Sequence, residues 1–325
     1  MVKSPDEPKV GIVLIGRDEG ERLRRCFESL PPGIPTVYVD SASTDGSVEF
    51  ARSHGAEVVE LDLTSPFTAA RARNEGFAHL LKRYRRTDVV QFMDGDCQLE
   101  AGWLQTALIF LRENSQAAAV CGRRRERHPG ASVYNRLCDE EWDTTVGRAA
   151  ACGGDVMIKV GAIVEAGLYD GALIAGEEPE LCGRLRARGW TVWRLDTPMT
   201  IHDAAIFHFG QWWRRAIRSG YGYAQVWHKT VRLQRDPLYG RELARAVGWS
   251  LGVIVLAVVA SSVFGAVGLV LAPVIWMLQY FRLSFYHGVR RAGFLMLGKF
   301  AEFLGAARYA SALLARRPGT AILYK

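Results

Sequence analysis

The fold of this chain is decided by residues 89–96, which read Val89-Val90-Gln91-Phe92-Met93-Asp94-Gly95-Asp96. A short apolar run is typical of a buried strand, and two carboxylates around a glycine are typical of a turn at its carboxyl end. Two such carboxylates can converge on one hard divalent cation, because Mg²⁺ and Mn²⁺ prefer oxygen ligands and the phosphate oxygens of a substrate. The same pattern also arises by chance or as a turn cap, so this stretch alone leaves both interpretations open.

Strands and helices alternate on both sides of this stretch up to about residue 240. Such alternation predicts an α/β fold with a mostly parallel sheet that is covered by helices on both faces. Ligands of these sheets bind beyond the carboxyl ends of the strands. The predicted strands are 10–15, 36–39, 58–61, 89–93 and 117–121, and the predicted helices are 19–30, 69–83 and 102–113.

A second polar turn follows the strand that ends at Val39. Asp40 stands at the strand end, and Ser43 and Asp45 follow it within a few residues. One interpretation is that Asp40 is a strand-end residue and that Ser43 or Asp45 caps the next helix. The other is that Asp40 accepts hydrogen bonds from a nucleotide, and the two interpretations are compatible.

Length and charge exclude several classes of protein. With 325 residues, the chain can form one catalytic domain with an appendage, and it is too long for a small disulfide-stapled scaffold. The net charge is +7, and residues 282–325 supply all of it with eight basic residues against Glu302. A balanced body with a basic tail beside an apolar run favours an anionic membrane surface over nucleic acid as partner.

The cysteines and the first residues predict the compartment. Six cysteines are present without a C-x-x-C pair, so neither a zinc site nor a disulfide framework is predicted, and a reducing cytosolic environment fits. Residues 1–8 are polar and lack the apolar segment of a secretory signal. We therefore expect the first domain to stay on the cytosolic side.

Residues 246–281 form a run without Asp, Glu, Lys or Arg. One spanning helix needs about 20 apolar residues, so this run predicts two short spans or a membrane hairpin, broken around Ser261, Ser262 and Gly265. Positive charge on both flanks favours a hairpin with both ends on the cytoplasmic side. The alternative is a pair of buried core helices. The flanking charges are Arg241, Arg245, Arg282, Arg290 and Arg291.

A further helix is predicted at about 292–317, because apolar residues recur there at helical spacing. It is interpreted as an interfacial amphipathic helix, and the alternative is a helix packed on the soluble domain. The predicted organisation is a catalytic domain at 1–240 and a membrane-associated helical region at 241–325.

Five sequence motifs occur in order along the first domain. They are the strand 10–15 with Arg17-Asp18-Glu19-Gly20 and the helix 23–30, then Val39-Asp40-Ser41-Ala42-Ser43-Thr44-Asp45-Gly46-Ser47, Ala72-Arg73-Asn74-Glu75-Gly76, Asp94-Gly95-Asp96, and Gly176-Glu177-Glu178-Pro179-Glu180-Leu181. In this order they resemble the family-2 inverting glycosyltransferases with the GT-A fold, and the resemblance spans residues 10 to about 225. It implies a GT-A nucleotide-sugar-binding domain ahead of the helical region.

The resemblance also implies roles for single residues. Donor binding would fall to Asp18, Glu19, Asp40, Ser43, Arg73 and Asp94, together with Gly154 and Asp155 of the glycine-rich segment 152–155. The metal, Mg²⁺ or Mn²⁺, would be held by Asp94, Asp96 and His202. From the residues alone, the glycine-rich segment is equally an ordinary turn, and His202 is equally a surface or core histidine.

The catalytic base implied by the resemblance is Glu178, with Glu177 as a neighbour that would raise the pKa of one member of the pair. The alternative is a helix start that is stabilised by carboxylates near the positive end of the helix dipole, with a Glu180–Arg184 pair. The acceptor or membrane side is predicted to include Glu177, Gln211, Trp212 and Arg214. The last three resemble the family's Q-x-x-R-W element, and a pure interface anchor is the alternative.

Two further groups stay open. The run Arg123, Arg124, Arg125 and Arg127 is typical of a solvated loop, and the alternative is a contact to pyrophosphate or a lipid phosphate. Trp142 either stacks on a sugar or belongs to the core.

The activity implied is the metal-dependent, inverting transfer of a sugar from a nucleotide-sugar, a UDP-sugar in our prediction, to a hydroxyl of a lipid-linked or glycan acceptor. We place this enzyme at the cytoplasmic face of the inner membrane, in cell-surface polysaccharide or glycolipid synthesis. The alternatives are a polyprenyl-phosphate sugar synthase, a sugar nucleotidyltransferase and a non-catalytic, membrane-tethered binding protein.

Overall fold

The computed structural model describes residues 9–62, 64–231 and 238–315. Two compact units are found. The first contains the described residues up to Leu173 together with Glu177–Phe207, and the second contains Ile174–Gly176 and the described residues from His208 onward.

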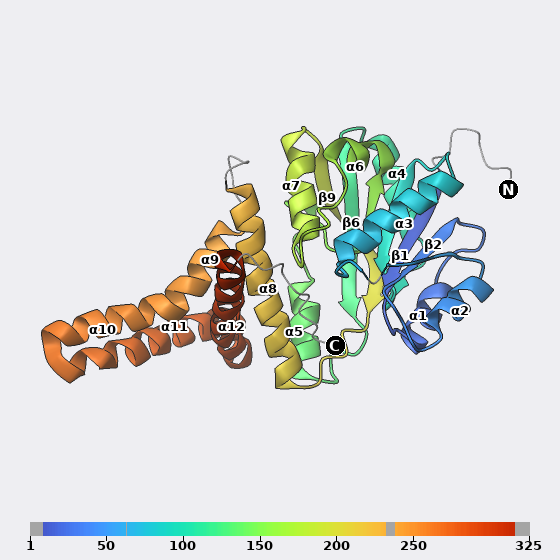
Figure 1. Ribbon diagram of the computed structural model, residues 1–325. Helices are drawn as coiled ribbons and strands as arrows, with labels where there is room; N and C mark the ends of the chain where they lie inside the picture. The colour runs from blue at the N-terminus through green and yellow to red at the C-terminus, as the bar shows by residue number, and fades with distance from the viewer. Residues whose placement is uncertain (1–8, 63, 232–237, 316–325) are drawn as a thin grey trace. The chain divides into compact units, whose positions relative to one another are not determined.

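The first unit is built on a nine-stranded sheet in the order β3-β2-β1-β4-β8-β6-β9-β5, with β7 paired to β9 (Figure 1). The strands β3, β2, β1 and β4 are parallel neighbours, as the sequence predicts. Beyond β4 the sheet is mixed, because β8 runs antiparallel to both β4 and β6 while β6 and β9 are parallel. The strands are β1 Val10–Gly16, β2 Thr36–Asp40, β3 Glu57–Glu60, β4 Val89–Asp94, β5 Cys97–Leu99, β6 Ala117–Glu126, β7 Gly147–Arg148, β8 Val156–Lys159 and β9 Thr191–His202.

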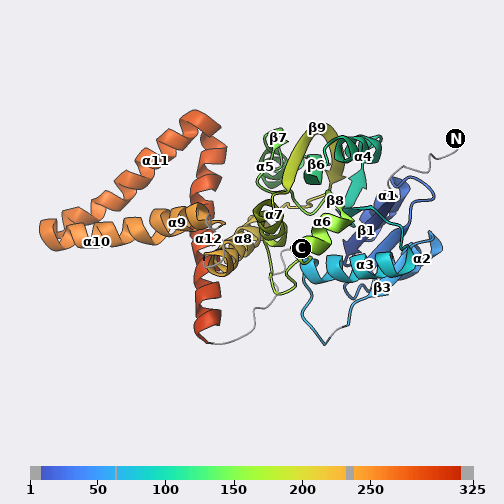
Figure 2. The same cartoon turned by 90° about the horizontal axis from the view of Figure 1, so that it is seen from above.

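Helices cover both faces of this sheet, which confirms the predicted α/β fold (Figure 2). Right-handed crossovers place α1 and α2 on one face, and the return crossover from β3 to β4 places α3 on the other. The helices are α1 Glu21–Glu28, α2 Ser47–Ser53, α3 Ala69–Arg83, α4 Trp103–Glu113, α5 Val133–Glu141, α6 Val160–Ala166 and α7 Glu177–Ala187.

The beginnings of α3 and α7 matter for the site. The hydroxyl of Thr68 accepts a hydrogen bond from the backbone N–H of Arg71, which caps α3 and fixes where its first turn begins. α7 begins at Glu177 directly after Gly176, whose φ of +84° is a conformation that glycine adopts without strain.

The expectation that the arginine run at 123–127 forms a solvated loop is wrong. β6 continues through Glu126 and includes Arg123, Arg124 and Arg125. Ion pairs within the unit and pairing with β9 compensate the charge of Arg123 and Arg124, so the strand extends five residues past its apolar part.

The second unit is helical, and its apolar run forms a hairpin. α10 and α11 are separated at Gly265, where φ is +67°, close to the predicted break. The indole N–H of Trp276 donates to the carbonyl oxygen of Trp249 across the hairpin at 2.9 Å. The helices are α8 Phe209–Thr230, α9 Gly240–Val247, α10 Val253–Phe264, α11 Leu271–His287 and α12 Val289–Leu314, with a π-helical turn at Gly248–Gly252 and a 3₁₀ segment at Gly265–Val270.

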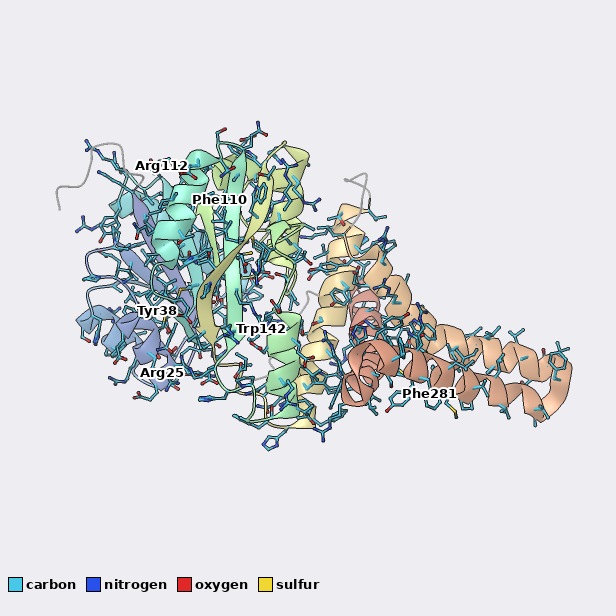
Figure 3. All side chains as sticks on the ribbon, turned by 180° about the vertical axis from the view of Figure 1, so that it is seen from behind. Arg25, Tyr38, Phe110, Arg112, Trp142 and Phe281 are labelled. Atoms are coloured by element: carbon cyan, nitrogen blue, oxygen red, sulfur yellow. The ribbon has the colours of Figure 1, made fainter. Side chains whose placement is uncertain are left out.

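The hairpin leaves large apolar side chains exposed. Phe264 is 71% exposed, and Phe281, which is labelled in Figure 3, is 62% exposed. The helical stretch Gly240–His287 is long and apolar enough to cross a membrane, and only 17% of its most apolar window is buried. A pair of buried core helices, the alternative from the sequence, does not fit this exposure.

α8 and α12 pack at very short range through glycines. A Cβ on Gly220 would overlap the backbone carbonyl of Glu302, and a Cβ on Gly305 would overlap that of Ile217. The opposite face of α12 exposes Leu304, and Leu314 is 86% exposed. The helix predicted at about 292–317 therefore has one face of small residues against α8 and one exposed apolar face. Residues 316 and 317 lie outside the described residues.

Candidate active site

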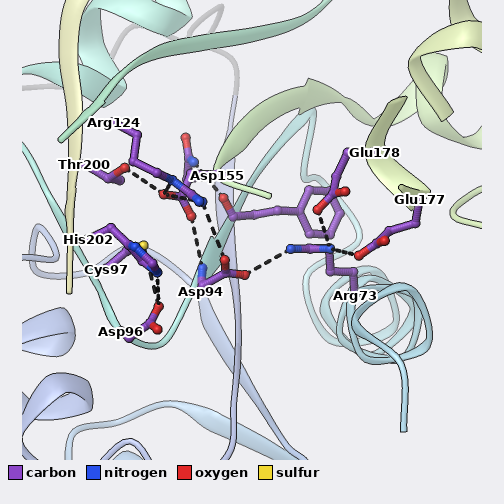
Figure 4. A network of polar contacts seen from close by, with 12 residues as sticks. Arg73, Asp94, Asp96, Cys97, Arg124, Asp155, Glu177, Glu178, Thr200 and His202 are labelled. Atoms are coloured by element: carbon purple, nitrogen blue, oxygen red, sulfur yellow. Dashed lines mark hydrogen bonds and ion pairs between the residues drawn. The ribbon is translucent and has the colours of Figure 1, made fainter. Parts of the chain in front are cut away.

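Charged side chains from strands and helices of the first unit meet at the carboxyl end of β4 (Figure 4). Asp94 closes β4, Arg73 comes from α3, and Glu177 and Glu178 open α7. Asp155 precedes β8. The structure thus brings together residues that are far apart in the sequence, at the strand ends where ligands of such sheets bind.

Arg73 is the centre of the first cluster. Its side chain is 3% exposed, and its guanidinium lies 3.0 Å from an oxygen of each of Asp94, Glu177 and Glu178. The ring of Tyr169 lies 5.6 Å from the guanidinium carbon. One buried cation therefore balances three carboxylates, and it fixes the start of α7 relative to the end of β4.

Glu178 has an unusual proton affinity. Burial and the neighbouring charge of Glu177 raise its pKa to about 7, although Arg73 acts in the opposite direction. Its side chain is 17% exposed, against 4% for Glu177. Glu178 is thus the more accessible member of the pair and is poised to gain or lose a proton near neutral pH.

Gly154 lies against this cluster. A Cβ at this position would overlap a guanidinium nitrogen of Arg73 and would lie 3.2 Å from Glu178 Oε1 and 3.3 Å from Asp94 Oδ1. A Cβ on the adjacent Gly153 would meet nothing within 4 Å. Only the second of the two glycines is therefore required by the packing of the site.

A second cluster holds Asp94 from the opposite side. The buried carboxylate of Asp155 accepts hydrogen bonds from the backbone N–H of Asp94 at 3.1 Å, from Arg124 Nε at 2.9 Å and from the Thr200 hydroxyl at 2.6 Å. Burial raises the pKa of Asp155, but Arg124 and Thr200 outweigh it, so the net shift is downward and Asp155 stays ionised.

The third cluster contains Asp96 and His202. Asp96 Oδ1 lies 3.1 Å from His202 Nε2, and both side chains are buried. The ring of Trp142 packs edge-on against His202 at 4.7 Å, and Arg124 lies 5.5 Å from the Trp142 ring centre. Trp142 is therefore part of the wall of this cluster.

The two polar loops after β1 and β2 are tied together. Asp18 accepts a hydrogen bond from the backbone N–H of Thr44 at 2.7 Å, and its own N–H donates to the Ser43 hydroxyl at 2.9 Å. The buried carboxylate of Asp40 accepts from the Tyr38 hydroxyl at 3.1 Å and from the N–H of Ser43 at 2.8 Å. Asp18, Asp40 and Ser43 thus form one constellation.

This loop pair adjoins the Arg73 cluster, because β2, β1 and β4 are neighbours in the sheet and their carboxyl ends coincide. Gly16 is paired with Asp40, and Ile15 with Asp94. Glu19, also in this loop pair, forms an ion pair with Arg22 at 2.8 Å. The assignment of these loops to a nucleotide stays a prediction.

Gln211, Trp212 and Arg214 lie on α8, in the second unit. Trp212 is buried there, with its ring 5.1 Å from that of Phe294. Their role toward an acceptor also stays a prediction.

Two residues at the site, Thr200 and Cys97, escaped the sequence analysis as functional candidates. Arg124, for which the sequence left a phosphate contact open, is found paired with Asp155. Arg124 is paired with Thr200 across β6 and β9, so their side chains share one face of the sheet. The sequence signal that could have identified Thr200 is its two-residue spacing from His202, because alternate residues of a strand lie on the same face.

Comparison with known proteins agrees with this geometry. The sequence profile described as Glycosyl transferase family 2 matches residues 12–160. Among curated proteins, no significant match is found.

Two solved structures share the fold. The mannosyltransferase PcManGT from Pyrobaculum calidifontis, in complex with GDP-Man and Mn²⁺, is 18% identical, with a TM-score of 0.66 over 94% of this chain and 88% of that chain. GalNAc-T7 with UDP, GalNAc and Mn²⁺ is 14% identical, with a TM-score of 0.53 over 77% of this chain and 52% of that chain. The predicted GT-A fold is confirmed.

Proposed function

We propose that this chain, whose residues 12–160 are a Glycosyl transferase family 2 domain, is a nucleotide-sugar glycosyltransferase that transfers its sugar with inversion. The acceptor is a hydroxyl group, and Glu178 is the base. The observation that carries this proposal is the position of Glu178. It is a carboxylate with a pKa of about 7, more exposed than Glu177, at the edge of a cluster that continues to Asp94 through Arg73.

Glu178 would take the proton of the acceptor hydroxyl as that oxygen attacks the anomeric carbon of the donor. A base works best when its pKa is near the working pH, because it is then both deprotonated and basic enough. Arg73 holds the carboxylate in place, and the lack of a side chain at Gly154 leaves room for it.

The residues at the third cluster fit a divalent cation. Two cis ligands of an octahedral ion at about 2.1 Å lie roughly 3 Å apart, and Asp96 Oδ1 and His202 Nε2 are 3.1 Å apart. Asp96 and His202 would hold Mg²⁺ or Mn²⁺, and Asp94, which pairs with Arg73 and Arg124, lies beside them. A bound ion there would neutralise charge on the diphosphate of the donor. Mn²⁺ is present in both solved structures described above.

The nucleotide is tested together with the metal. We expect Mn²⁺ to strengthen binding of UDP, our predicted nucleotide, to the full chain in detergent, as measured by calorimetry with GDP in parallel. Asp96→Ala should weaken the Mn²⁺-dependent binding by about tenfold or more, which is 1.4 kcal/mol. Asp88→Ala is the matched control, because Asp88 is exposed and precedes the opposite end of β4.

Two results would count against the proposal. Binding of either nucleotide that ignores Mn²⁺ would contradict the metal assignment. Binding of neither nucleotide by folded protein would contradict a nucleotide-sugar donor and favour the non-catalytic alternative. If GDP binds in place of UDP, only the predicted nucleotide changes.

The helical region supports a lipid-linked acceptor. The π-helical turn and α10 contain 5 and 12 residues and α11 contains 17, so each arm of the hairpin is roughly 25 Å long, close to the hydrocarbon thickness of a bilayer. In our proposal this hairpin lies in the inner membrane with the catalytic domain on the cytoplasmic face, in cell-surface polysaccharide or glycolipid synthesis.

This placement predicts the sidedness of the hairpin flanks. Single cysteines introduced at Arg245 and Arg290, in a chain whose native cysteines are replaced, should react with a membrane-impermeant thiol reagent from the cytoplasmic side only. A cysteine at Phe264, near the tip, should be shielded from the reagent on that side. Labelling of the two flanks from opposite sides would refute the hairpin.

A further inference from the structure

Cys97 lies opposite a residue of the third cluster. β5 and β9 are antiparallel, and their register pairs Cys97 directly with His202. Side chains of directly opposed residues lie on the same face of a sheet with their Cβ atoms about 5 Å apart. The thiol and the imidazole are therefore directed to the same place by the backbone, and Asp96 is the neighbour of Cys97 in the chain.

The donor atoms of these three residues converge. The Asp96, Cys97 and His202 ligand atoms lie within 4.8 Å of one another, and all three side chains are buried. Cys97 Sγ lies 3.8 Å from Asp96 Oδ1 (Figure 4). In the described part of the chain, His202 Nδ1 is a buried nitrogen without a hydrogen-bond partner.

We propose that Asp96, Cys97 and His202 together bind a thiophilic divalent cation, Zn²⁺ or Cd²⁺, in competition with the hard cation of the proposed function. The competition rests on that function, because Asp96 and His202 cannot hold both ions at once. Thiolate, imidazole and carboxylate groups are all ligands of zinc, which takes four ligands, so a fourth position stays open.

The geometry needs little change to close around such an ion. With bonds of about 2.0–2.3 Å, the ligands of a tetrahedral zinc lie roughly 3.3–3.7 Å apart. Here Asp96 Oδ1 lies 3.1 Å from His202 Nε2 and 3.8 Å from Cys97 Sγ. Sulfur is the donor that distinguishes this set from one of oxygen and nitrogen alone, since thiolates select Zn²⁺ over Mg²⁺ or Mn²⁺. Binding converts the Cys97 thiol to a thiolate, and its proton goes to the buffer.

Cd²⁺ is the probe, because a cadmium–thiolate bond gives a charge-transfer band in the ultraviolet. Titration of the metal-free full chain in detergent should produce this band with one equivalent of Cd²⁺. In Cys97→Ser the band should be lost and the affinity for Cd²⁺ should fall by at least about tenfold. Cys138→Ser is the matched control, since Cys138 is a buried cysteine on α5, and it should keep the band.

A second measurement uses the unaltered protein. Cd²⁺ should release bound Mn²⁺, which is followed as the paramagnetic resonance signal of free Mn²⁺. A band that persists in Cys97→Ser, or Mn²⁺ that stays bound at saturating Cd²⁺, would overturn the inference.

The failures of the two proposals are distinguishable. Mn²⁺-dependent nucleotide binding without the cadmium band would contradict only the thiophilic site. The band without Mn²⁺-dependent nucleotide binding would contradict the proposed function, and the competition with it, but not the thiophilic site.

Discussion

Replacing Glu178 by Gln should lower kcat by about 10²- to 10⁴-fold while nucleotide binding is retained. Gln has nearly the same shape but cannot accept the proton of the acceptor hydroxyl. The Gln side chain can still accept a hydrogen bond from Arg73, which lies 3.0 Å from Glu178 Oε1. The first turn of α7 should therefore stay in place. Transfer rates with saturating donor, beside calorimetric nucleotide binding, test this expectation.

The pH dependence gives an independent check. Glu178 acts as a base only when it is deprotonated, so with a pKa of about 7 the rate should rise with pH through that value. Glu177→Gln is the matched variant: it removes a negative charge that raises the pKa of Glu178, so the rising limb should move to lower pH. Full turnover by Glu178→Gln, or a limb that does not move in Glu177→Gln, would refute the assignment of the base.

Replacing Arg73 by Met should cost about 3–5 kcal/mol of stability. The change leaves three carboxylates without their shared cation, and two of them, on Glu177 and Glu178, are adjacent at the start of α7. The midpoint of thermal unfolding should fall by about 6–20 °C, because each kcal/mol corresponds to about 2–4 °C in a domain of this size.

The same variant should be a poor enzyme at neutral pH wherever it is still folded. Arg73 lowers the pKa of Glu178, so its loss raises that pKa and leaves the base protonated. Lys82→Met is the control, since Lys82 is an exposed cation on the same helix. An Arg73→Met protein that unfolds at the temperature of the wild type would contradict the role of Arg73 as the shared cation.

The sequence predicts the first half of the sheet well because its signals are local. Apolar runs that end in acidic turns define β1, β2 and β4, and the helix predicted at 69–83 is found at those residues. These elements place Arg73 against Asp94, and Asp40 at the end of a neighbouring strand, while the roles of these residues stay predictions.

The second half of the sheet, beyond β4, is harder to predict from the sequence because its strands depend on contacts with distant residues. The charged residues of β6 are typical of a loop. They are accommodated in a strand because Asp155, just before β8, pairs with Arg124 and accepts a hydrogen bond from Thr200 of β9. The pairing of Cys97 with His202 depends on an antiparallel register that no short motif encodes. Strands of this kind are stabilised by partners distant in the chain, and periodicity alone does not reveal those partners.

The glycine contact between α8 and α12 has a consequence for the order in which the chain matures on the ribosome. His228 on α8 contacts Tyr309 on α12, 81 residues later. At about 5–20 residues per second, α8 waits roughly 4–16 s for its partner, and the apolar hairpin emerges during that interval. The apolar hairpin is therefore synthesised before the helix pair can close, and until then the glycine-containing face of α8 lacks the partner that Gly305 of α12 brings to it.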